Sequence, residues 1–365
     1  MTLPPLDRIP PQVASLSDYE ALARERMSEA SWAYLNGGSG DEWTLRENTE
    51  AFARIPLRSR VLREMAGATT RIELFGMELA APILLAPVAF QKLAHVDGEL
   101  ASVIAAGALD SAMVVSTQAS VSLEDIAAHA GGPLWFQLYI QPDREFTAAL
   151  VRRAEQAGYR AFVVTVDAPV NGLRNREQRA GFAVPSGIAA VNLAGMRPLP
   201  PASPEALLFG TPLIESAPTW SDLAWLRDLT RLPILLKGIV DPDDAVRAID
   251  AGMDGIIVSN HGGRALDGVP ATIELLPEVA QAVAGAVPVL MDGGVRRGID
   301  VLRALALGAS AVLIGRPYVH ALAAAGAPGV AHVLRLLRAE LELAMAFTGC
   351  STITAIDASV IARRP

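Results

Sequence analysis

Eight short apolar runs, separated by stretches with helical spacing, predict an α/β fold and, more specifically, a (β/α)8 TIM barrel. None of the runs alternates between apolar and polar residues, which is typical of strands buried on both faces of a parallel sheet. A doubly wound sheet would show the same order of strands and helices, but the count of eight and the polar residues at the run ends favour the barrel. The predicted strands are residues 82–90, 112–118, 135–140, 161–169, 233–240, 255–263, 288–294 and 311–317.

Glycines mark the expected ends of several barrel helices. Gly158, Gly252 and Gly308 each follow a stretch rich in Ala and charged residues. A glycine just past a helix can adopt the left-handed conformation that ends it. We therefore expect helices to end immediately before these three positions.

The residues before the first strand predict an N-terminal helical segment, residues 1–80, that closes the barrel. Within it we expect a helix over residues 17–36. Ser17 and Glu20 have the spacing of a capping box, and the glycines at 37 and 38 end the helix.

One connection is much longer than the others. The predicted strands start 22–33 residues apart, except for the fourth and fifth, which start 72 residues apart. The excess, residues 181–219, contains seven prolines and little periodicity. A long loop in a compact barrel is usually a lid or a binding loop, with a disordered insertion as the alternative. We expect a lid, because the loop follows a strand that ends in polar residues.

Size and charge restrict the class of protein. The 365 residues, 51% of them hydrophobic, suffice for one large core, so we expect residues 1–365 to form a single barrel domain. A net charge of −8 argues against a nucleic-acid partner. We expect no membrane partner, because no run of about 18 uncharged apolar residues is present. Cys350 is the only cysteine and no targeting signal is visible, which suits a cytoplasmic location.

In such a barrel the active site lies at the C-terminal ends of the strands. These ends supply backbone at the first strand and polar or glycine residues at the other seven. The candidates in chain order are Pro87, Val88, Ala89, Ser116, Thr117, Gln137, Tyr139, Thr165, Asp167, Arg174, Lys237, Ser259, Asn260, His261, Arg264, Asp292, Gly293, Gly294, Arg296, Gly315 and Arg316.

The ends of the seventh and eighth strands have the composition of a phosphate site. Residues 292–298 (DGGVRRG) and 315–317 (GRP) combine glycines, which let backbone N–H groups approach an anion, with arginines that neutralise it. A glycine pair alone could simply serve a turn. An arginine in each loop favours phosphate binding.

Several charged candidates point to an anionic organic acid. His261 can act as a general base near neutral pH, and Asp167 could orient it and stabilise the imidazolium. Arg174 and Arg264 could bind a carboxylate, with surface ion pairs as the alternative. Lys237 ends an apolar strand, where it could stabilise an anionic cofactor, form a Schiff base or simply reach the barrel mouth.

Other chemistries have little support. No GxSxG motif is present and Cys350 lies outside the strand ends, which argues against a serine or cysteine nucleophile. His95, His129, His320 and His332 are scattered, so we expect no metal site and regard these histidines as structural or exposed.

Together these motifs resemble the FMN-dependent 2-hydroxy acid oxidase and dehydrogenase family, which includes glycolate oxidase, lactate oxidase, mandelate dehydrogenase and hydroxymandelate oxidase. The resemblance covers about residues 17–358, and its most specific motif is SNHGGRALD at 259–267. Agreement in order and spacing extends to residues 33–52, 86–95, 135–140, 235–239, 292–298 and 314–317.

The resemblance implies the oxidation of an (S)-2-hydroxy acid to the 2-oxo acid, with FMN as cofactor. His261, paired with Asp167, would take the substrate proton. Tyr34 and Tyr139 would bond the substrate hydroxyl and carboxylate, and Arg174 and Arg264 would clamp the carboxylate. Family members are commonly tetramers or octamers, so a homotetramer or octamer is implied.

The resemblance also implies how FMN is held. The backbone of Pro87, Val88 and Ala89 would face the flavin ring, and Lys237 would lie by N1 and the C2 carbonyl. The ring edge would be bonded by Ser116, Gln137, Thr165 and Ser259. The phosphate would be held by Asp292, Gly293, Gly294, Val295, Arg296, Gly315 and Arg316.

The sequence departs from the family pattern around the substrate side chain. Gln118 stands where glycolate oxidase carries a tryptophan that shapes the pocket, and Val88 replaces a threonine common in the plant enzymes. The segment after Arg174, NREQRAGF, keeps only part of the pattern. The side-chain pocket therefore differs from that of glycolate oxidase.

Three functions remain open at this point. Ala89 stands where lactate monooxygenase has glycine, which favours an oxidase that reduces O2 to H2O2. The alternative is a dehydrogenase with a quinone or protein acceptor, although the prolines in residues 181–219 do not resemble the apolar insertion of membrane-bound members. The third is a barrel that binds FMN or a sugar phosphate without redox catalysis, which would not need His261, Asp167 and two arginines together.

Overall fold

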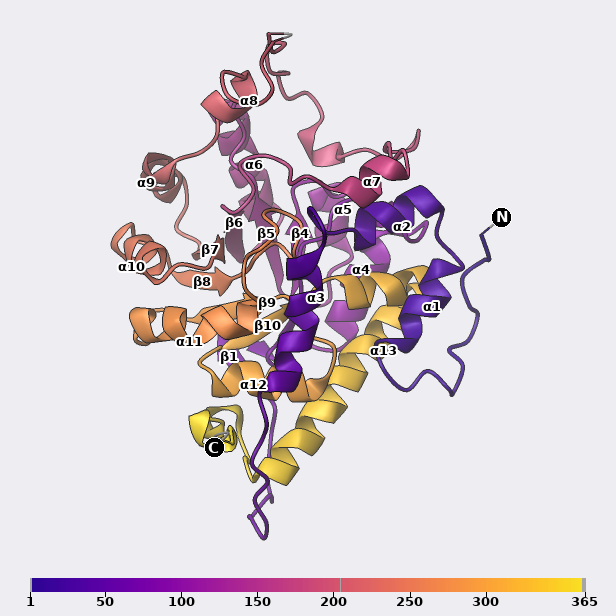
Figure 1. The fold of residues 1–365 in the computed structure, drawn as a ribbon, viewed down its shortest axis with the longest axis vertical. Coiled ribbons are helices and arrows are strands. Elements are labelled where there is room, and N and C mark those ends of the chain that lie inside the picture. The colour runs from indigo at the N-terminus through magenta and orange to yellow at the C-terminus, as the bar shows by residue number, and fades with distance from the viewer. Residues whose placement is uncertain (1, 204, 363–365) are drawn as a thin grey trace.

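The computed structural model of the chain describes residues 2–203 and 205–362. Its centre is a closed barrel of parallel strands in the order β10-β3-β4-β5-β6-β7-β8-β9 (Figure 1). The first and last of these strands, β3 and β10, pair with each other, so the TIM barrel is confirmed and the doubly wound sheet is excluded. The eight predicted strands are all present, as β3 (Ile83–Leu85), β4 (Met113–Ser116), β5 (Leu134–Leu138), β6 (Ala161–Thr165), β7 (Ile234–Ile239), β8 (Gly255–Val258), β9 (Val289–Asp292) and β10 (Ala311–Ile314).

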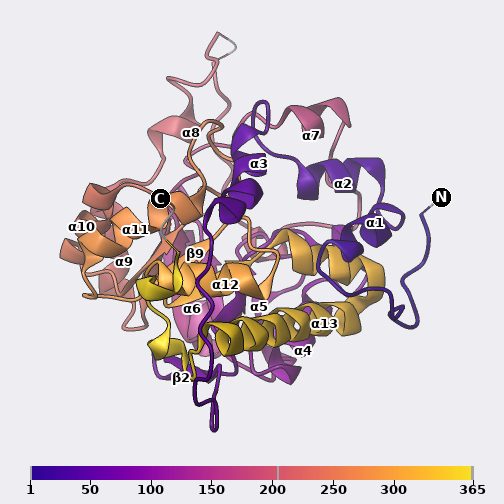
Figure 2. The same ribbon diagram turned by 60° about the horizontal axis from the view of Figure 1, so that its bottom comes forward.

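Helices follow the strands and cover the outside of the barrel. The last of them bends at Ala325 and Gly326 and packs against α4, α12 and α1 (Figure 2). The helices are α4 (Glu99–Ala108), α5 (Leu123–Ala128), α6 (Arg144–Gln156), α9 (Trp220–Leu229), α10 (Pro242–Asp250), α11 (Thr272–Val283), α12 (Gly298–Ala306) and α13 (Arg316–Thr348). None of the helices in the described ranges combines the length and the apolarity needed to cross a bilayer.

The predicted helix ends are confirmed at three glycines. Gly158, Gly252 and Gly308 lie one residue past the C-caps of α6, α10 and α12. Their φ angles are 91°, 78° and 108°, which is the left-handed region that glycine adopts without a steric penalty. After α6, α10 and α12 the chain therefore turns back towards the next strand where the sequence predicted it.

The N-terminal segment contains two helices in place of the single helix expected at its start. They are α1 (Asp18–Arg24) and α2 (Glu29–Asn36). Ser28 begins the second helix, because its Oγ accepts the N–H of Ser31 at 3.1 Å. The predicted end is confirmed, since Gly37 is the C-cap of α2.

The capping box predicted at Ser17 and Glu20 is wrong. Ser17 has helical backbone angles, and its side chain makes no cap hydrogen bond. The carboxylate of Asp18 accepts the N–H groups of Ala14 at 2.9 Å and Ser15 at 2.8 Å instead. Ser17 does lie at the N-cap position of α1, but the side chain that caps the chain here is that of Asp18, and it caps the turn before the helix.

The prediction of a helical segment is also wrong over residues 72–79. There β1 (Ile72–Leu74) and β2 (Met77–Leu79) form an antiparallel hairpin, which covers the N-terminal end of the barrel. The ring of Phe75 meets that of Trp135 edge-on at 5.7 Å, and Trp135 fills the barrel interior beside Met77. The hairpin thus keeps water out of the end of the barrel opposite the predicted site.

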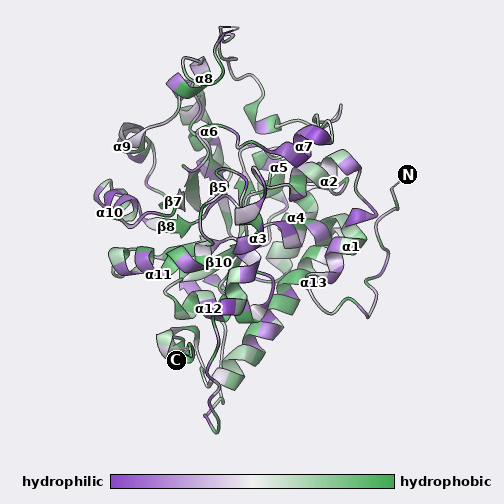
Figure 3. Ribbon diagram, viewed as in Figure 1, coloured by the Kyte–Doolittle hydropathy of each residue, from purple (hydrophilic) through white to green (hydrophobic). Residues whose placement is uncertain are grey.

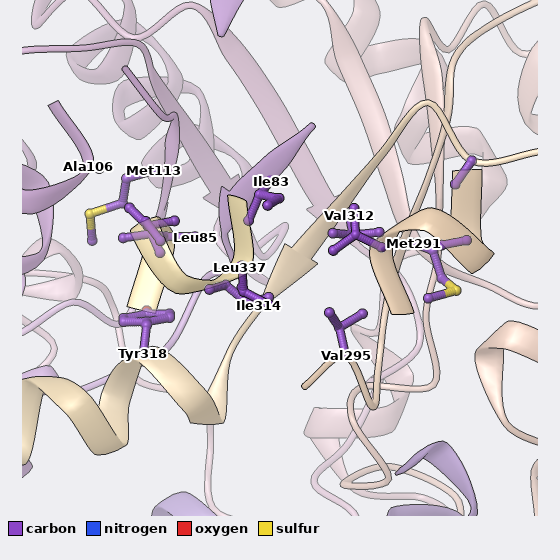
Figure 4. Close-up of a cluster of buried hydrophobic side chains, with 14 of the residues drawn as sticks. Ile83, Leu85, Ala106, Met113, Met291, Val295, Val312, Ile314, Tyr318 and Leu337 are labelled. Atoms are coloured by element: carbon purple, nitrogen blue, oxygen red, sulfur yellow. The ribbon is translucent and has the colours of Figure 1, made fainter. Parts of the chain in front are cut away.

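Two apolar cores lie on the two sides of the barrel wall. Outward-facing residues of the strands pack against the helices, as Figure 4 shows for Leu85, Met113 and Ile314 beside Tyr318 and Leu337. Figure 3 shows the same division along the chain, with apolar strands inside and polar residues on exposed elements such as α3 and α7. Burying each large apolar side chain contributes about 1.5–3 kcal/mol.

The inner core fixes which residues reach the mouth of the barrel. Side chains of a strand point to alternate faces, so the residue two positions after an interior residue also points inward. The interior residues are Leu84, Val114, Trp135, Val163, Leu235, Ile257, Leu290 and Leu313. Two positions further along, the same strands carry Ala86, Ser116, Gln137, Thr165, Lys237, Ser259, Asp292 and Gly315.

The long connection between β6 and α9 begins with α7 (Asn175–Arg179). Its later part, predicted over residues 181–219, contains η3 (Val191–Leu193) and α8 (Pro212–Glu215). The segment is anchored to the barrel by Asn192, which is fully buried and whose Oδ1 accepts the N–H of Leu123 at 2.9 Å. Leu207 and Phe209 are exposed at its outer part.

The helix α3 (Trp43–Glu50) lies against the loops that follow β8 and β9. Asn48 on this helix and Asn260 after β8 are both buried, and their amides exchange hydrogen bonds of 2.9 and 2.8 Å. A Cβ atom on Gly294 would lie 1.7 Å from the carbonyl oxygen of Asn48. Glycine is therefore needed at 294 for the approach of α3, and not only for an anion.

Replacing Gly294 with Ala should lower the free energy of unfolding more than replacing Gly252 with Ala. Both glycines have a left-handed φ, so both variants bear a backbone strain of about 1 kcal/mol. A Cβ at 252 meets nothing within 4 Å, whereas the clash at 294 should cost a further ~1–3 kcal/mol. Urea unfolding measures both, and equal losses would contradict the close approach of α3.

Candidate active site

A cavity opens at the C-terminal ends of the barrel strands. Almost every residue predicted for the site lines it. These are Tyr34, Pro87, Val88, Ala89, Ser116, Gln137, Tyr139, Thr165, Arg174, Lys237, His261, Arg264, Asp292, Gly293, Gly294, Val295, Arg296, Gly315 and Arg316. Four predicted residues do not line it. Asp167 and Ser259 lie behind the wall and contact His261 and Lys237, and Thr117 and Asn260 bond to Gln137 and Asn48.

His261 and Asp167 form a hydrogen-bonded pair at the cavity. Nδ1 of His261 lies 2.7 Å from Oδ1 of Asp167, and a carboxylate can only accept, so Nδ1 carries the proton and Nε2 is free to act as a base. Burial disfavours the charged carboxylate, but His261 and Lys237 outweigh it and hold the pKa of Asp167 below its usual value. Asp167 is therefore ionised and can stabilise a protonated His261.

Backbone geometry creates the space for this pair. Gly238 has a φ of 111°, and a Cβ there would lie 2.4 Å from Cβ of Asp167. The register between β7 and β8 shifts at this point. His261 itself has a φ of 57°, which is uncommon for a residue with a side chain and is a conformation found at functional sites.

Lys237 is paired, and so it does not resemble a Schiff-base lysine with a depressed pKa. Its Nζ lies 2.9 Å from Oδ2 of Asp292 and donates to Oγ of Ser259 at 2.8 Å. Burial lowers the pKa of Lys237, but the carboxylates of Asp292 and Asp167 raise it further than burial lowers it. The site therefore holds a fixed positive charge at the end of β7.

Three partly buried arginines of the cavity, Arg264, Arg296 and Arg316, have no carboxylate partner within 4 Å in the described ranges. Nη1 of Arg264 donates to the carbonyl oxygens of Tyr34 at 2.6 Å and Gly37 at 2.9 Å. Burial, and in second place a neighbouring arginine for Arg264 and Arg316, lowers the pKa of these guanidinium groups. Such an excess of partly buried positive charge is typical of a site for anionic ligands.

Arg174 lies in the cavity wall and also forms an ion pair. It lines the cavity, yet its Nη1 lies 3.0 Å from Oε2 of Glu177 and its Nη2 donates to Asn171 at 3.0 Å. Its guanidinium also lies 5.7 Å from the ring of Tyr34, and that of Arg264 lies 5.3 Å from the same ring. The ring of Tyr34 thus makes cation–π contacts with both arginines.

Both tyrosines keep their protons at neutral pH. Burial raises the pKa of Tyr139 to about 12 and also raises the pKa of Tyr34. Neutral phenols can donate a hydrogen bond to a carboxylate or an alkoxide oxygen. Phe182, just inside the long connection, stacks on Tyr34 at 4.3 Å between ring centroids.

A short hydrogen-bonded chain joins the predicted ring-edge residues. Oε1 of Gln137 accepts from Oγ of Ser116 at 3.3 Å and from the N–H of Thr117 at 3.2 Å. Its Nε2 donates to Oγ1 of Thr165 at 3.1 Å. The three side chains come from consecutive strands, β4, β5 and β6, so their positions are set by the barrel wall.

Sequence reasoning missed several residues of the cavity. Asn48 and His320 both line it, although one lies on α3 and the other was expected to be structural or exposed. Gln118, predicted to shape the pocket, lines it as well. A lone asparagine or histidine carries no local pattern, and only the folded arrangement brings these residues to the strand ends.

No cluster of His, Cys, Asp and Glu suited to a metal ion is found in residues 2–203 and 205–362. Cys350 is buried and lies away from the cavity lining. The chemistry of the cavity therefore resides in the histidine, the lysine, the arginines and the tyrosines.

Comparison with known proteins agrees with this arrangement. The model of the FMN-dependent dehydrogenase family matches residues 23–363. The chain belongs to this family. It is 49% identical to L-lactate oxidase from Alicycliphilus denitrificans over 96% of this chain and 97% of the relative. It is 43% identical to glycolate oxidase 5 from Oryza sativa over 94% of both chains.

Solved structures resemble it equally well. A crystal structure of mandelate oxidase with (S)-2-phenylpropionate superposes with a TM-score of 0.87 and 45% identity, and the match covers 96% of this chain and 98% of that one. Family membership makes FMN the cofactor of this chain.

The residues of the cavity also fit FMN, independently of the relatives. Nε of Arg316 and Oδ1 of Asp292 are buried in its wall and have no hydrogen-bond partner in the described part of the chain. Arg296 and Arg316 supply charge for a phosphate, and the polar chain from Ser116 to Thr165 supplies partners for the flavin ring. FMN carries a dianionic phosphate and polar ring atoms. These groups can supply the charge and hydrogen-bond partners that the cavity residues lack.

Sulfate or phosphate at millimolar concentration should raise the melting temperature of the FMN-free protein. The reason is that either anion offsets the partly buried charge of Arg296 and Arg316, and a ligand that binds only the folded state stabilises it. Arg296→Met should reduce the effect, whereas Arg46→Met, on the exposed face of α3, should leave it unchanged. An equal rise with sodium chloride at the same ionic strength would contradict a specific anion site.

Proposed function

We propose that this protein oxidises an (S)-2-hydroxy acid to the 2-oxo acid, with FMN as cofactor and O2 as the electron acceptor, which is reduced to H2O2. One observation carries the proposal: a histidine base oriented by a partly buried aspartate faces the same cavity as a partly buried arginine without a carboxylate partner. A base beside a free guanidinium suits a substrate that carries a hydroxyl group next to a carboxylate. The names of the relatives, L-lactate oxidase and (S)-2-hydroxyacid oxidase, support the S configuration and the acceptor.

The substrate carboxylate is bound by Arg264 and Arg174, with Tyr34 and Tyr139 as neutral hydrogen-bond donors to the carboxylate and the hydroxyl. Arg264 is fixed by two backbone carbonyl groups, which leaves its other N–H groups for a carboxylate. Arg174 is shared with Glu177, so Arg264 supplies the larger part of the attraction. This clamp places the hydroxyl-bearing carbon within reach of His261.

His261 takes the substrate proton on Nε2. Asp167 holds the ring through Nδ1 and stabilises the positive charge that forms on it. FMN accepts the two electrons when bound. Lys237, fixed by Asp292 and Ser259, would supply a positive charge that stabilises negative charge on the cofactor.

The remaining predicted residues hold the cofactor. The flavin ring would be held by the backbone of residues 87–89 and by the side chains of Ser116, Gln137, Thr165 and Ser259. The phosphate would be held by Asp292, Gly293, Gly294, Val295, Arg296, Gly315 and Arg316. All but Ser259 line the cavity, which supports both assignments.

The proposal extends to the domain organisation of the chain. Residues 1–365 form one FMN hydroxy acid dehydrogenase-type domain, with residues 181–219 as a lid over the cavity. The stacking of Phe182 on Tyr34 supports the lid, because it joins that connection to a cavity residue. We further propose a homotetramer or octamer and a cytoplasmic location.

His261→Gln should retain FMN and its yellow colour but reduce the flavin at least about 10²- to 10⁴-fold more slowly, since base catalysis alone contributes that factor. The measurement is the anaerobic loss of flavin absorption after mixing with substrate. His129→Gln is the matched control, because His129 is exposed and lies outside the cavity. Near-normal reduction in His261→Gln would remove His261 from the role of base.

The reduced wild-type enzyme should be reoxidised by dissolved oxygen at least as fast as it turns over, with one H2O2 formed per acid oxidised. Stopped-flow mixing with air-saturated buffer measures the rate, and a quinone serves as the competing acceptor. Reoxidation by oxygen that is much slower than turnover with the quinone would favour the dehydrogenase alternative.

A further inference from the structure

His320 is a buried, titratable residue of the cavity wall that the mechanism above does not use. It lies on α13, four residues after Arg316, and only 5% of it is exposed. Its ring stacks on that of Trp32 at 5.4 Å between centroids. A polar ring buried in this way needs a partner on both nitrogens or a ligand that supplies one.

One ring nitrogen has a partner that fixes the tautomer. Nε2 of His320 lies 2.6 Å from Oδ1 of Asn36 on α2. Nδ2 of Asn36 donates to the carbonyl oxygen of Trp32 at 3.2 Å, so Oδ1 is correctly placed as the acceptor and Nε2 of His320 carries a proton. In the neutral ring Nδ1 is then bare, and it has no hydrogen-bond partner in the described residues.

The charged groups that act on His320 are all positive. They are Arg296, from the loop after β9, and Arg316, from the start of α13, whereas α2 contributes only the uncharged Asn36 and Trp32. Burial and, after it, these two arginines lower the pKa of His320 to about 3. Without a ligand the ring is therefore neutral.

We propose that His320 is a further phosphate-binding residue of the FMN site, which takes up one proton from solvent at Nδ1 when the phosphate binds and then donates that proton in a hydrogen bond to the phosphate. The inference rests on the assignment of the phosphate to Arg296 and Arg316 made above. A bound dianion cancels the repulsion from both arginines and favours a third positive charge. One N–H bond forms at Nδ1, and the proton comes from hydronium or the buffer acid in solvent, whose bond to that proton breaks.

Linkage determines the direction of the pH effect. Because the complex binds one more proton than the free protein, the affinity for FMN increases as pH falls through the pKa that His320 has in the complex. Riboflavin lacks the phosphate, so its affinity should not show this dependence. FMN and riboflavin therefore form a matched pair of ligands that differ only in the group under test.

The test is isothermal titration of the FMN-free, full-length protein with FMN and with riboflavin at several pH values between about 5.5 and 7.5. Each titration is repeated in two phosphate-free buffers of different ionisation enthalpy, which gives the number of protons taken up. The phosphate of FMN itself titrates near pH 6, so the wild-type protein is compared with variants at each pH. The wild type should take up more protons than the variants with FMN and the same number with riboflavin.

Two variants separate binding from folding. His320→Gln keeps a donor for Asn36, and His320→Phe keeps an aromatic ring against Trp32. Loss of one charge-assisted hydrogen bond should weaken FMN binding roughly 10- to 100-fold in both, while riboflavin affinity changes less than about twofold. Circular dichroism and the melting temperature of the FMN-free variants report on folding.

Two results would overturn the inference, and they are distinguishable. If both variants lose affinity for FMN and riboflavin equally, with no change in proton uptake, His320 only joins α2 to α13. If the wild-type protein binds FMN no more tightly than riboflavin, the assignment of the phosphate to Arg296 and Arg316 is itself wrong.

Discussion

The alternation of side chains along the barrel strands is the constraint on which the rest of this structure depends. Seven of the eight strands direct one residue into the apolar interior and the residue two positions later into the cavity, whereas Ser259, which follows β8, lies behind the cavity wall. Lys237 and Asp292 reach the cavity in this way above Leu235 and Leu290. Polar groups on strands whose inner neighbours are tightly packed are held more precisely than groups on loops.

The second feature that determines what the cavity can bind is an excess of positive charge that the described protein groups do not neutralise. Lys237 is compensated by Asp292, but the hydrogen bonds of the partly buried Arg264, Arg296 and Arg316 go to backbone carbonyl groups. Partly buried cations without acidic partners oppose folding, so we expect anionic ligands to stabilise this protein. Two kinds of anion suit the arrangement, a phosphate near Arg296 and Arg316 and a carboxylate near Arg264.

A single backbone group links these two anion sites. The carbonyl oxygen of Gly37 accepts hydrogen bonds from Nη1 of Arg264 at 2.9 Å and from Nη2 of Arg316 at 3.1 Å. Gly37 ends α2, which also carries Tyr34 and Asn36. The N-terminal helices therefore complete the cavity as well as cover the barrel.

Much of this could be predicted from sequence because it depends on local patterns. Buried strands are continuous apolar runs, and each strand end carries its functional residue within the same short segment, as with Lys237 or His261. The features that sequence reasoning predicted wrongly or missed depend on tertiary contacts. The hairpin at residues 72–79 is stabilised by Trp135, and Asn48 reaches Asn260 across 212 positions of sequence. Neither partner leaves a signal near the other in the chain.

The central claim is that the cavity oxidises a 2-hydroxy acid held through its carboxylate. The most direct measurement is anaerobic mixing of the yellow protein with glycolate, (S)- and (R)-lactate, (S)- and (R)-mandelate and a long-chain 2-hydroxy acid. The account predicts that at least one S acid bleaches the flavin, that its R enantiomer and its amide do not, and that air restores the colour. A protein that stays yellow with every acid, or that bleaches equally with an acid and its amide, would contradict it.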